Sequence, residues 1–230
     1  MRGLCSNGVK AVAFELIPEF ERARGIKLYI MWASTNMLLE EINKGATGDL
    51  AILTDEAIDD LIRQGRMMAG SRVDLAQSAI GIAVRNGAPK PDIGSAEAFK
   101  QALLSARTIS YSKTGISGVY FPTVLDRLGI AEAVKSKTVI PTPGVAVVGD
   151  LVARGEADIG VQQISELLPV PGIEVVGPLP AELQKLTVFS SGIFVGAKEA
   201  EVARALVTAL TSAAARDVYV SKGMEPMSKS

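Results

Sequence analysis

One pattern constrains the fold of this chain more than any other: a short apolar strand, a polar turn, and then an amphipathic helix. The pattern occurs four times, with its turns at residues 6–8, 34–36, 112–118 and 142–145. Alternation of strands and helices is typical of an α/β fold, in which helices flank a mixed, mainly parallel sheet. A helix N-terminus also leaves its first backbone N–H groups without acceptors within the helix. Each polar turn can therefore hold an anion, or simply cap its helix.

The composition excludes several kinds of site. The chain of 230 residues has no histidine, which removes the commonest general base and the commonest zinc ligand. The single cysteine, Cys5, removes disulfides and thiolate metal clusters, so no metal and no cofactor is expected. The net charge of −1 gives no reason to expect a nucleic-acid partner. An anionic ligand would have to be held by local dipoles.

The sequence gives limited indications of location. No apolar stretch approaches the roughly 20 residues of a membrane span, so no membrane insertion is expected. The first four residues lack the hydrophobic core of a signal peptide, so we expect a cytoplasmic protein as written. A longer natural precursor would change this expectation to the periplasm, and only then would a transporter permease be a partner.

An internal similarity indicates two lobes. Residues 42–52 (INKGATGDLAI) parallel residues 151–161 (LVARGEADIGV), apart from one extra residue in the first segment. Each segment contains a helix end, a glycine turn and a strand led by an aspartate. We expect lobe I to comprise residues 1–78 and 191–230 and lobe II residues 79–190. The chain would cross between them through hinge strands near 77–83 and 186–193.

Two α/β lobes of this kind would bring the four turns together. Ligands of open α/β sheets bind outside the carboxyl ends of the strands. If the lobes face each other, the four helix N-termini converge on one cleft, where N–H donors replace the water around a small oxyanion.

Three local expectations complete the reading. Pro18 should kink or divide the helix that begins near residue 9, because proline removes a helical hydrogen bond. Residues 199–214 should form one helix, and residues 218–226 should be a tail.

The order of these elements resembles that of the molybdate-binding type of periplasmic solute-binding protein. The resemblance is carried by ASTN at 33–36, GATGD at 45–49, SGVY at 117–120, the block from Val145 to Val161, and Gly223-Met224. It implies the two-lobed type II periplasmic-binding-protein fold, closing around one ligand. It places oxyanion ligands at Gly8, Ser34 or Thr35, Ser117, Val145 and Gln163.

Two of these positions depart from the family pattern. Gly8 stands where the family has a serine, with Ser6 and Asn7 before it, and Gln163 stands where the family has a tyrosine. The loss of two hydroxyls disfavours molybdate or tungstate. Glutamine offers both a donor and an acceptor, which suits an organic carboxylate. The predicted ligand-binding residues are Ser6, Asn7, Gly8, Ser34, Thr35, Asn36, Thr114, Ser117, Gly118, Gly144, Val145 and Gln163.

Two functions are compatible with such a site. The first is a binding protein for a small anion, with an organic carboxylate expected and molybdate or tungstate transport less favoured. The second is an isomerase of a small unsaturated polycarboxylate, since proteins similar to this family include an aconitate isomerase. A site rich in N–H donors would stabilise the enolate-like charge formed when a proton leaves carbon. Without histidine, the candidate bases are Cys5, Lys113 and Tyr120, each of which would need a lowered pKa.

Overall fold

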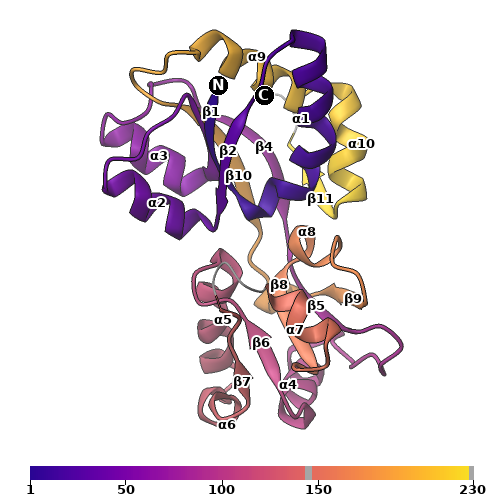
Figure 1. The fold of residues 1–230 in the computed structure, drawn as a ribbon. Helices are drawn as coiled ribbons and strands as arrows, with labels where there is room; N and C mark the ends of the chain where they lie inside the picture. The colour runs from indigo at the N-terminus through magenta and orange to yellow at the C-terminus, as the bar shows by residue number, and fades with distance from the viewer. Residues whose placement is uncertain (143–146, 228–230) are drawn as a thin grey trace. The chain divides into compact units, whose positions relative to one another are not determined.

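The computed structural model describes residues 1–142 and 147–227. These residues divide into two compact units, the first formed by residues 1–78 and 187–230 and the second by residues 79–186. Each unit has one sheet with helices on both faces (Figure 1).

The first unit is built on a six-stranded sheet with the order β11-β4-β10-β3-β1-β2. β1 pairs in parallel with β2 and β3, and the remaining pairs are antiparallel. Its elements are β1 (Arg2–Ser6), η1 (Asn7–Val9), α1 (Lys10–Arg24), β2 (Tyr29–Ala33), α2 (Thr35–Asn43), β3 (Leu50–Thr54), α3 (Asp55–Arg63), β4 (Val73–Ser78), β10 (Thr187–Ile193), α9 (Ala200–Leu210), α10 (Ala213–Ser221) and β11 (Met224–Pro226).

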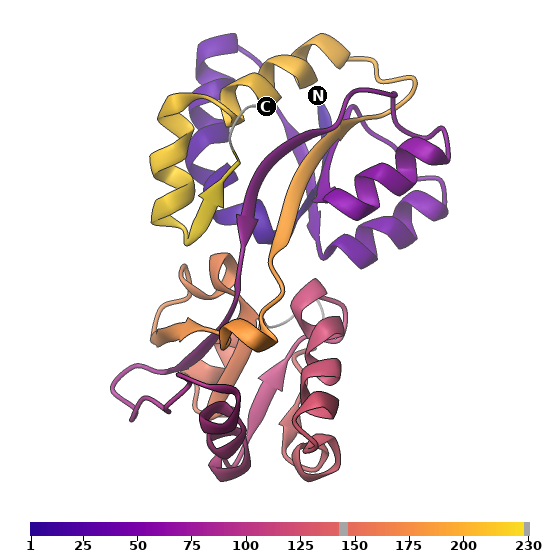
Figure 2. The same cartoon turned by 180° about the vertical axis from the view of Figure 1, so that it is seen from behind.

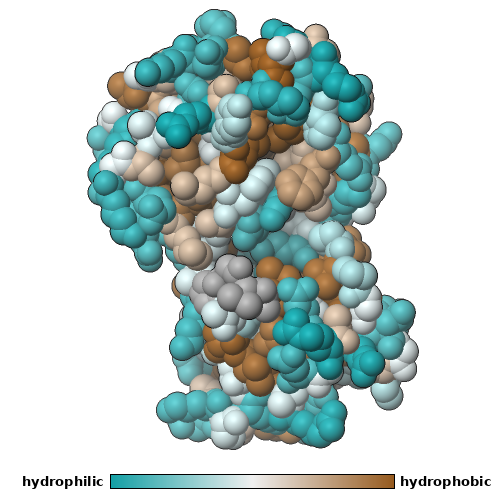
Figure 3. All heavy atoms as spheres, in the orientation of Figure 1, coloured by the Kyte–Doolittle hydropathy of each residue, from teal (hydrophilic) through white to brown (hydrophobic). Residues whose placement is uncertain are grey.

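Alternating side chains divide the first core between the two faces of the sheet. Cys5 and Ile52 face α1, α9 and α10, whereas Leu4 and Leu53 face α2 and α3. Figure 2 shows α9 and α10 from behind. On the visible face of this unit in Figure 3, hydrophobic colours lie between hydrophilic ones. Tyr29 and Met31 of the edge strand β2 are exposed.

The second unit is built on a five-stranded sheet with the order β7-β6-β8-β5-β9. β6 pairs in parallel with β7 and β8, and β5 pairs antiparallel with β8 and β9. Its elements are β5 (Ile80–Arg85), α4 (Ala96–Ser105), β6 (Ile109–Tyr111), α5 (Ile116–Arg127), α6 (Ala131–Lys135), β7 (Thr138–Val139), α7 (Val148–Ala153), β8 (Ile159–Gln163), α8 (Ile164–Leu167), β9 (Ile173–Pro178) and η2 (Ala181–Leu183).

The predicted α/β class and mixed sheets are confirmed, with more antiparallel pairing than expected. The antiparallel pairs of the first unit include β4 with β10, the two strands that adjoin the passages of the chain between the units. Residues 187–190, which we placed in lobe II, belong to β10 and to the first unit.

Three local features differ from expectation. α1 is one helix that continues through Pro18, so the proline does not divide it. The expected helix over 199–214 is two helices, because Ser212 caps α10 and its hydroxyl accepts a hydrogen bond from the Ala215 N–H. The expected tail contains the end of α10 and then β11, which pairs with β4.

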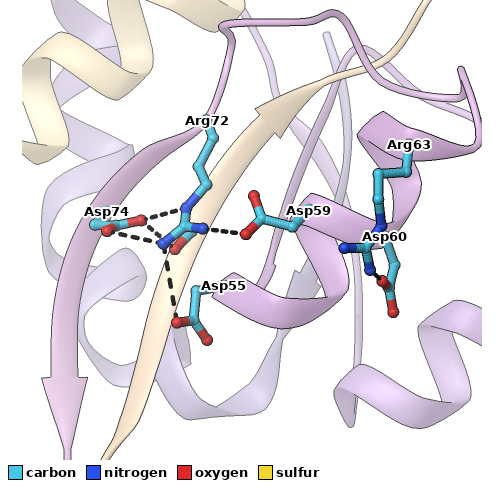
Figure 4. A network of polar contacts seen from close by, with 7 residues as sticks. Asp55, Asp59, Asp60, Arg63, Arg72 and Asp74 are labelled. Carbon is cyan, nitrogen blue, oxygen red and sulfur yellow. Dashed lines mark hydrogen bonds and ion pairs between the residues drawn. The ribbon is translucent and has the colours of Figure 1, made fainter.

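A polar network fastens α3 to β4 in the first unit (Figure 4). The Arg72 guanidinium makes two hydrogen bonds to the Asp74 carboxylate, of 2.8 and 3.0 Å, and also contacts Asp59. Asp74 in turn accepts a 2.6 Å hydrogen bond from the Ser190 hydroxyl of β10. The Arg72 contact is the main cause that lowers the pKa of Asp74, so this carboxyl is held in its charged form. These contacts hold α3, β4 and β10 of the first unit together.

Candidate ligand-binding site

In the first unit, the polar turns that follow β1 and β2 lie side by side. The two strands are parallel neighbours, and Ser6 at the end of β1 is in register with Ala33 at the end of β2. Both serines cap the helices that follow. The Ser6 hydroxyl accepts from the Gly8 N–H, and the Ser34 hydroxyl accepts from the Met37 N–H, each at 3.4 Å. The residues that this edge brings together are Ser6, Asn7, Gly8, Ser34, Thr35 and Asn36.

Thr35 is the exception among these caps. It is only 1% exposed at the first position of α2, and its hydroxyl has no hydrogen-bond partner among the described residues. An unsatisfied buried hydroxyl costs about 1–3 kcal/mol, so it is uncommon unless a ligand satisfies it.

The structure also accounts for the glycine at position 8. A Cβ on Gly8 would lie 2.1 Å from the ring of Phe189 in β10, so the first turn approaches that buried ring too closely for a side chain. The serine expected from the family cannot fit here without a shift of Phe189. The hydroxyl that it would supply is therefore absent for a packing reason.

In the second unit, a compact turn connects β6 to α5. The Ser112 hydroxyl accepts hydrogen bonds from the N–H groups of Thr114 and Gly115, at 3.3 and 3.0 Å. A Cβ on Gly118 would lie 1.6 Å from the Ser112 carbonyl oxygen, so only glycine allows the helix to begin this close to the turn. Ser117 in the first turn of α5 is 1% exposed, and within residues 1–142 and 147–227 its hydroxyl has no hydrogen-bond partner.

Gln163 lies at the same sheet edge as this turn. β8 is parallel to β6 with Tyr111 opposite Val161, so Gln163, two residues further on, lies beyond the end of β6. Gln163 is 1% exposed. The second unit therefore brings together Thr114, Ser117, Gly118 and Gln163. The predicted ligand residues Gly144 and Val145 lie outside the described residues.

Comparison with known proteins identifies the family. The family model described as bacterial extracellular solute-binding protein matches residues 2–225. The chain belongs to this family.

Two relatives and one solved structure agree with this assignment. The solute-binding protein is 38% identical to an aconitate isomerase of a Pseudomonas species, over 97% of this chain and 87% of the relative. It is 26% identical to the molybdate-binding protein ModA of Azotobacter vinelandii, over 91% of this chain and 83% of the relative. The solved periplasmic molybdate-binding protein of Azotobacter vinelandii superposes with a TM-score of 0.77 at 18% identity, covering 100% of both chains. The fold is therefore the type II periplasmic-binding-protein fold.

The structure argues against Cys5 as a base of this solute-binding protein. Cys5 is 1% exposed within the core of the first unit. Burial raises the pKa of its thiol to about 12, against a smaller lowering by a backbone hydrogen bond from Ile52. A thiol with this pKa stays protonated at neutral pH. The sequence suggested Cys5 because it ends a strand close to the first turn, but its side chain points into the core.

The other two candidate bases are near the second-unit turn. The Tyr120 hydroxyl donates a 3.1 Å hydrogen bond to the Leu183 carbonyl oxygen, and the Lys185 ammonium lies 6.0 Å from its ring centroid. Lys113 is an exposed residue of the turn. Neither the contacts of Tyr120 nor the exposed position of Lys113 prepares these groups to remove a proton from carbon.

Two buried polar residues of the second unit were missed as site candidates. Ser110 of β6 is 0% exposed, and its hydroxyl has no hydrogen-bond partner. Gln162 is 5% exposed, and its side-chain oxygen also has none, whereas its amide donates to Glu166 at 3.0 Å. The signal in the sequence for the second of these was the pair of glutamines at 162–163, which ends an otherwise apolar strand.

The described residues contain neither a metal-binding cluster nor a membrane-spanning helix. Residues 1–142 and 147–227 contain no cluster of three or more Cys, Asp or Glu that could hold a metal ion. Over the same residues, no helix is long and apolar enough to cross a bilayer.

Proposed function

We propose that this solute-binding protein binds a small organic polycarboxylate at the polar turns that precede its helices. The observation that carries the proposal is the pair of buried hydroxyls on Thr35 and Ser117 that lack hydrogen-bond partners. Each belongs to the first turn of a helix, where the N–H groups and the helix dipole favour a negative charge. A carboxylate oxygen accepting from such a hydroxyl would satisfy it.

Two features support a carboxylate over a tetrahedral metal oxyanion. Gly8 and Gln163 supply no hydroxyl at two positions where the resemblance expects one. The relative with 38% identity is an aconitate isomerase, and aconitate is a tricarboxylate.

The same relative favours a second candidate function, the isomerisation of the bound carboxylate. Removal of a proton from the carbon next to a C=C bond leaves an allylic anion, and return of the proton at its far carbon moves the double bond. The reaction needs no metal, oxidant or second substrate. The N–H and hydroxyl donors of the site would stabilise the charge that spreads onto the carboxylates.

The first test is a ligand screen by thermal shift, followed by calorimetry, with cis- and trans-aconitate, citrate, succinate, phosphate, sulfate and molybdate. We expect stabilisation by at least one tricarboxylate and a Kd in the micromolar range. Stabilisation by molybdate alone would overturn the proposal. Incubation with cis- or trans-aconitate, followed by proton NMR, tests isomerisation, and an unchanged spectrum would leave binding as the function.

A further inference from the structure

The carboxyl group of Glu166 is unusual among the acidic groups of the second unit. Glu166 is part of α8, which begins directly after β8. Within the described residues, its carboxyl accepts a 3.0 Å hydrogen bond from the Gln162 amide and pairs with no cation. Acidic groups on neighbouring elements are already engaged. Asp150 of α7 accepts from the Val147 N–H at 2.9 Å, and Glu174 of β9 pairs with Lys90 at 2.6 Å.

No cation compensates this carboxyl within the described residues. α8 packs on α7, β5, β8 and β9, and the basic residue in these elements is Arg85 at the far end of β5. β5 runs antiparallel to β8 with Ile80 opposite Gln163, so Arg85 lies at the opposite edge of the sheet from Glu166. Burial raises the pKa of Glu166 to about 7, and the Gln162 hydrogen bond only partly opposes this effect.

The position of this pair connects it with the candidate site. Gln162 shares a face of the sheet with Gly160, because side chains alternate along a strand. A Cβ on Gly160 would meet Val148 and Val152, so this face is the one that α7 covers. Gln162 lies beyond that contact at the carboxyl edge, where ligands of α/β sheets bind, on the opposite face from Gln163. Among the described residues, its buried side-chain oxygen has no hydrogen-bond partner. The pair therefore combines an unsatisfied acceptor with an uncompensated carboxyl at the edge that carries the predicted ligand residues.

We propose that Glu166 is the catalytic base that removes a proton from carbon and returns it during isomerisation of the bound carboxylate. This inference rests on the second candidate function above. The Glu166 carboxylate takes a proton from the CH₂ carbon beside the C=C bond, and the electrons of the broken C–H bond spread over the three allylic carbons. The protonated Glu166 then donates the same proton to the far carbon, which regenerates the carboxylate and moves the double bond. Gln162 positions the carboxyl group between these steps.

The experiment follows deuterium and isomer exchange in the full-length protein. Wild type, Glu166→Gln, Glu166→Asp and the control Glu132→Gln are incubated with cis- or trans-aconitate in D₂O and followed by proton NMR. Glu132 is an exposed carboxylate of the same unit, with 89% of its side chain accessible. Calorimetry with each variant measures the Kd for aconitate, and circular dichroism checks folding.

We expect Glu166→Gln to lower both exchange rates at least about 100-fold while the Kd changes less than about 5-fold. Glu166→Asp should retain partial activity, and Glu132→Gln should match wild type. The wild-type rate should rise with pH around a midpoint of about 7, because the base must be deprotonated. Full exchange by a folded Glu166→Gln variant would overturn the inference alone. Binding without any exchange by wild type would overturn isomerisation, and absence of binding would overturn the proposed function as well.

Discussion

Asp49 and Asp158 make equivalent contacts in the two units of the protein. Asp49 accepts a 2.7 Å hydrogen bond from the N–H of Arg2, where β1 begins, and Asp158 accepts a 2.9 Å hydrogen bond from the N–H of Arg107, just before β6. Each aspartate precedes a strand, β3 or β8, that is parallel to the strand it holds. The internal sequence similarity therefore corresponds to a hydrogen bond that both units share, from a backbone N–H to an aspartate carboxylate, which fixes the register of two neighbouring parallel strands.

Replacement of Asp49 should weaken the first unit. Burial by itself raises the pKa of the Asp49 carboxyl. Hydrogen bonds from the backbone N–H groups of Arg2, Glu199 and Lys198 together have the larger, opposite effect, so the pKa lies below its ordinary value of 3.8. A carboxyl with a lowered pKa contributes stability that is present above the unfolded pKa and is lost as pH falls through the folded pKa. Asp49→Asn should thus cost about 1–2 kcal/mol at neutral pH and reduce the loss of stability below pH 3.8.

Urea unfolding followed by Trp32 fluorescence measures this effect, because the single tryptophan lies in β2 of the first unit. Asp217→Asn, at an exposed position of α10, is the control. Equal stability of Asp49→Asn and wild type at pH 7 would contradict the role assigned to the carboxylate.

Removal of Arg72 should destabilise the same unit. Arg72→Ala leaves Asp59 and Asp74 without their cation, and we expect a loss of about 1–2 kcal/mol after allowance for solvent screening of these partly exposed groups. The double variant Arg72→Ala, Asp74→Ala should recover part of this loss. Trp32 fluorescence in urea again gives the measurement, with Arg216→Ala as the exposed control. If the double variant loses the sum of the stability losses of Arg72→Ala and Asp74→Ala measured singly, Arg72 and Asp74 are not coupled.

Removal of the buried hydroxyls of Thr35 and Ser117 should weaken ligand binding without lowering the stability of the free protein. Thr35→Val and Ser117→Ala each remove a buried hydroxyl that lacks a partner, so the free protein should be as stable as wild type or slightly more stable. Affinity for the carboxylate found in the screen should fall roughly 10-fold per variant, or about 1.4 kcal/mol. Calorimetry and thermal melting measure the two quantities. Thr208→Val, whose exposed hydroxyl donates to the Arg204 carbonyl oxygen, should not change the affinity.

A side chain at Gly118 should disrupt the turn before α5. Gly118→Ala would place its methyl group 1.6 Å from the Ser112 carbonyl oxygen, so the turn and the helix start must separate. We expect a loss of more than about 2 kcal/mol and at least about a 10-fold weaker affinity. Gly3→Ala is the matched control, because its Cβ would meet its nearest atom at an ordinary 3.5 Å. Unchanged binding by Gly118→Ala would show that this turn does not position the ligand.

The Cys5 thiol should be inert in the folded protein. Because its pKa is raised to about 12, it stays neutral at pH 8, and its burial blocks access. Ellman's reagent should react with it only in denaturant, with one equivalent released. Cys5→Ala should retain ligand binding and any isomerase activity. Rapid modification of the native protein, or loss of activity without unfolding, would restore Cys5 as a candidate base.

Sequence patterns predicted the helix ends and helix caps that depend only on residues close together in the chain. The αL glycines Gly45 and Gly155 end their helices as the internal repeat indicates, and Ser34 caps α2 through its hydroxyl. These features need only a few consecutive residues, so their chemistry is visible in the sequence. Pro18 does not divide α1, because Ile17 and Phe20 beside it are buried in the core of the first unit and hold this part of the chain in the helix.

The sequence alone determined the α/β class, the two-part organisation and the turns from which a ligand can be held, because these depend on the spacing of apolar, glycine and hydroxyl residues. Only the tertiary structure decided which polar groups at those turns are already satisfied. Ser6 and Ser34 are occupied as helix caps, whereas the hydroxyls of Thr35 and Ser117 are buried without partners. It also turned Cys5 into the core and left Glu166 with a single amide partner. Burial and hydrogen bonding depend on contacts between segments far apart in the chain, and these contacts set the chemistry of each group.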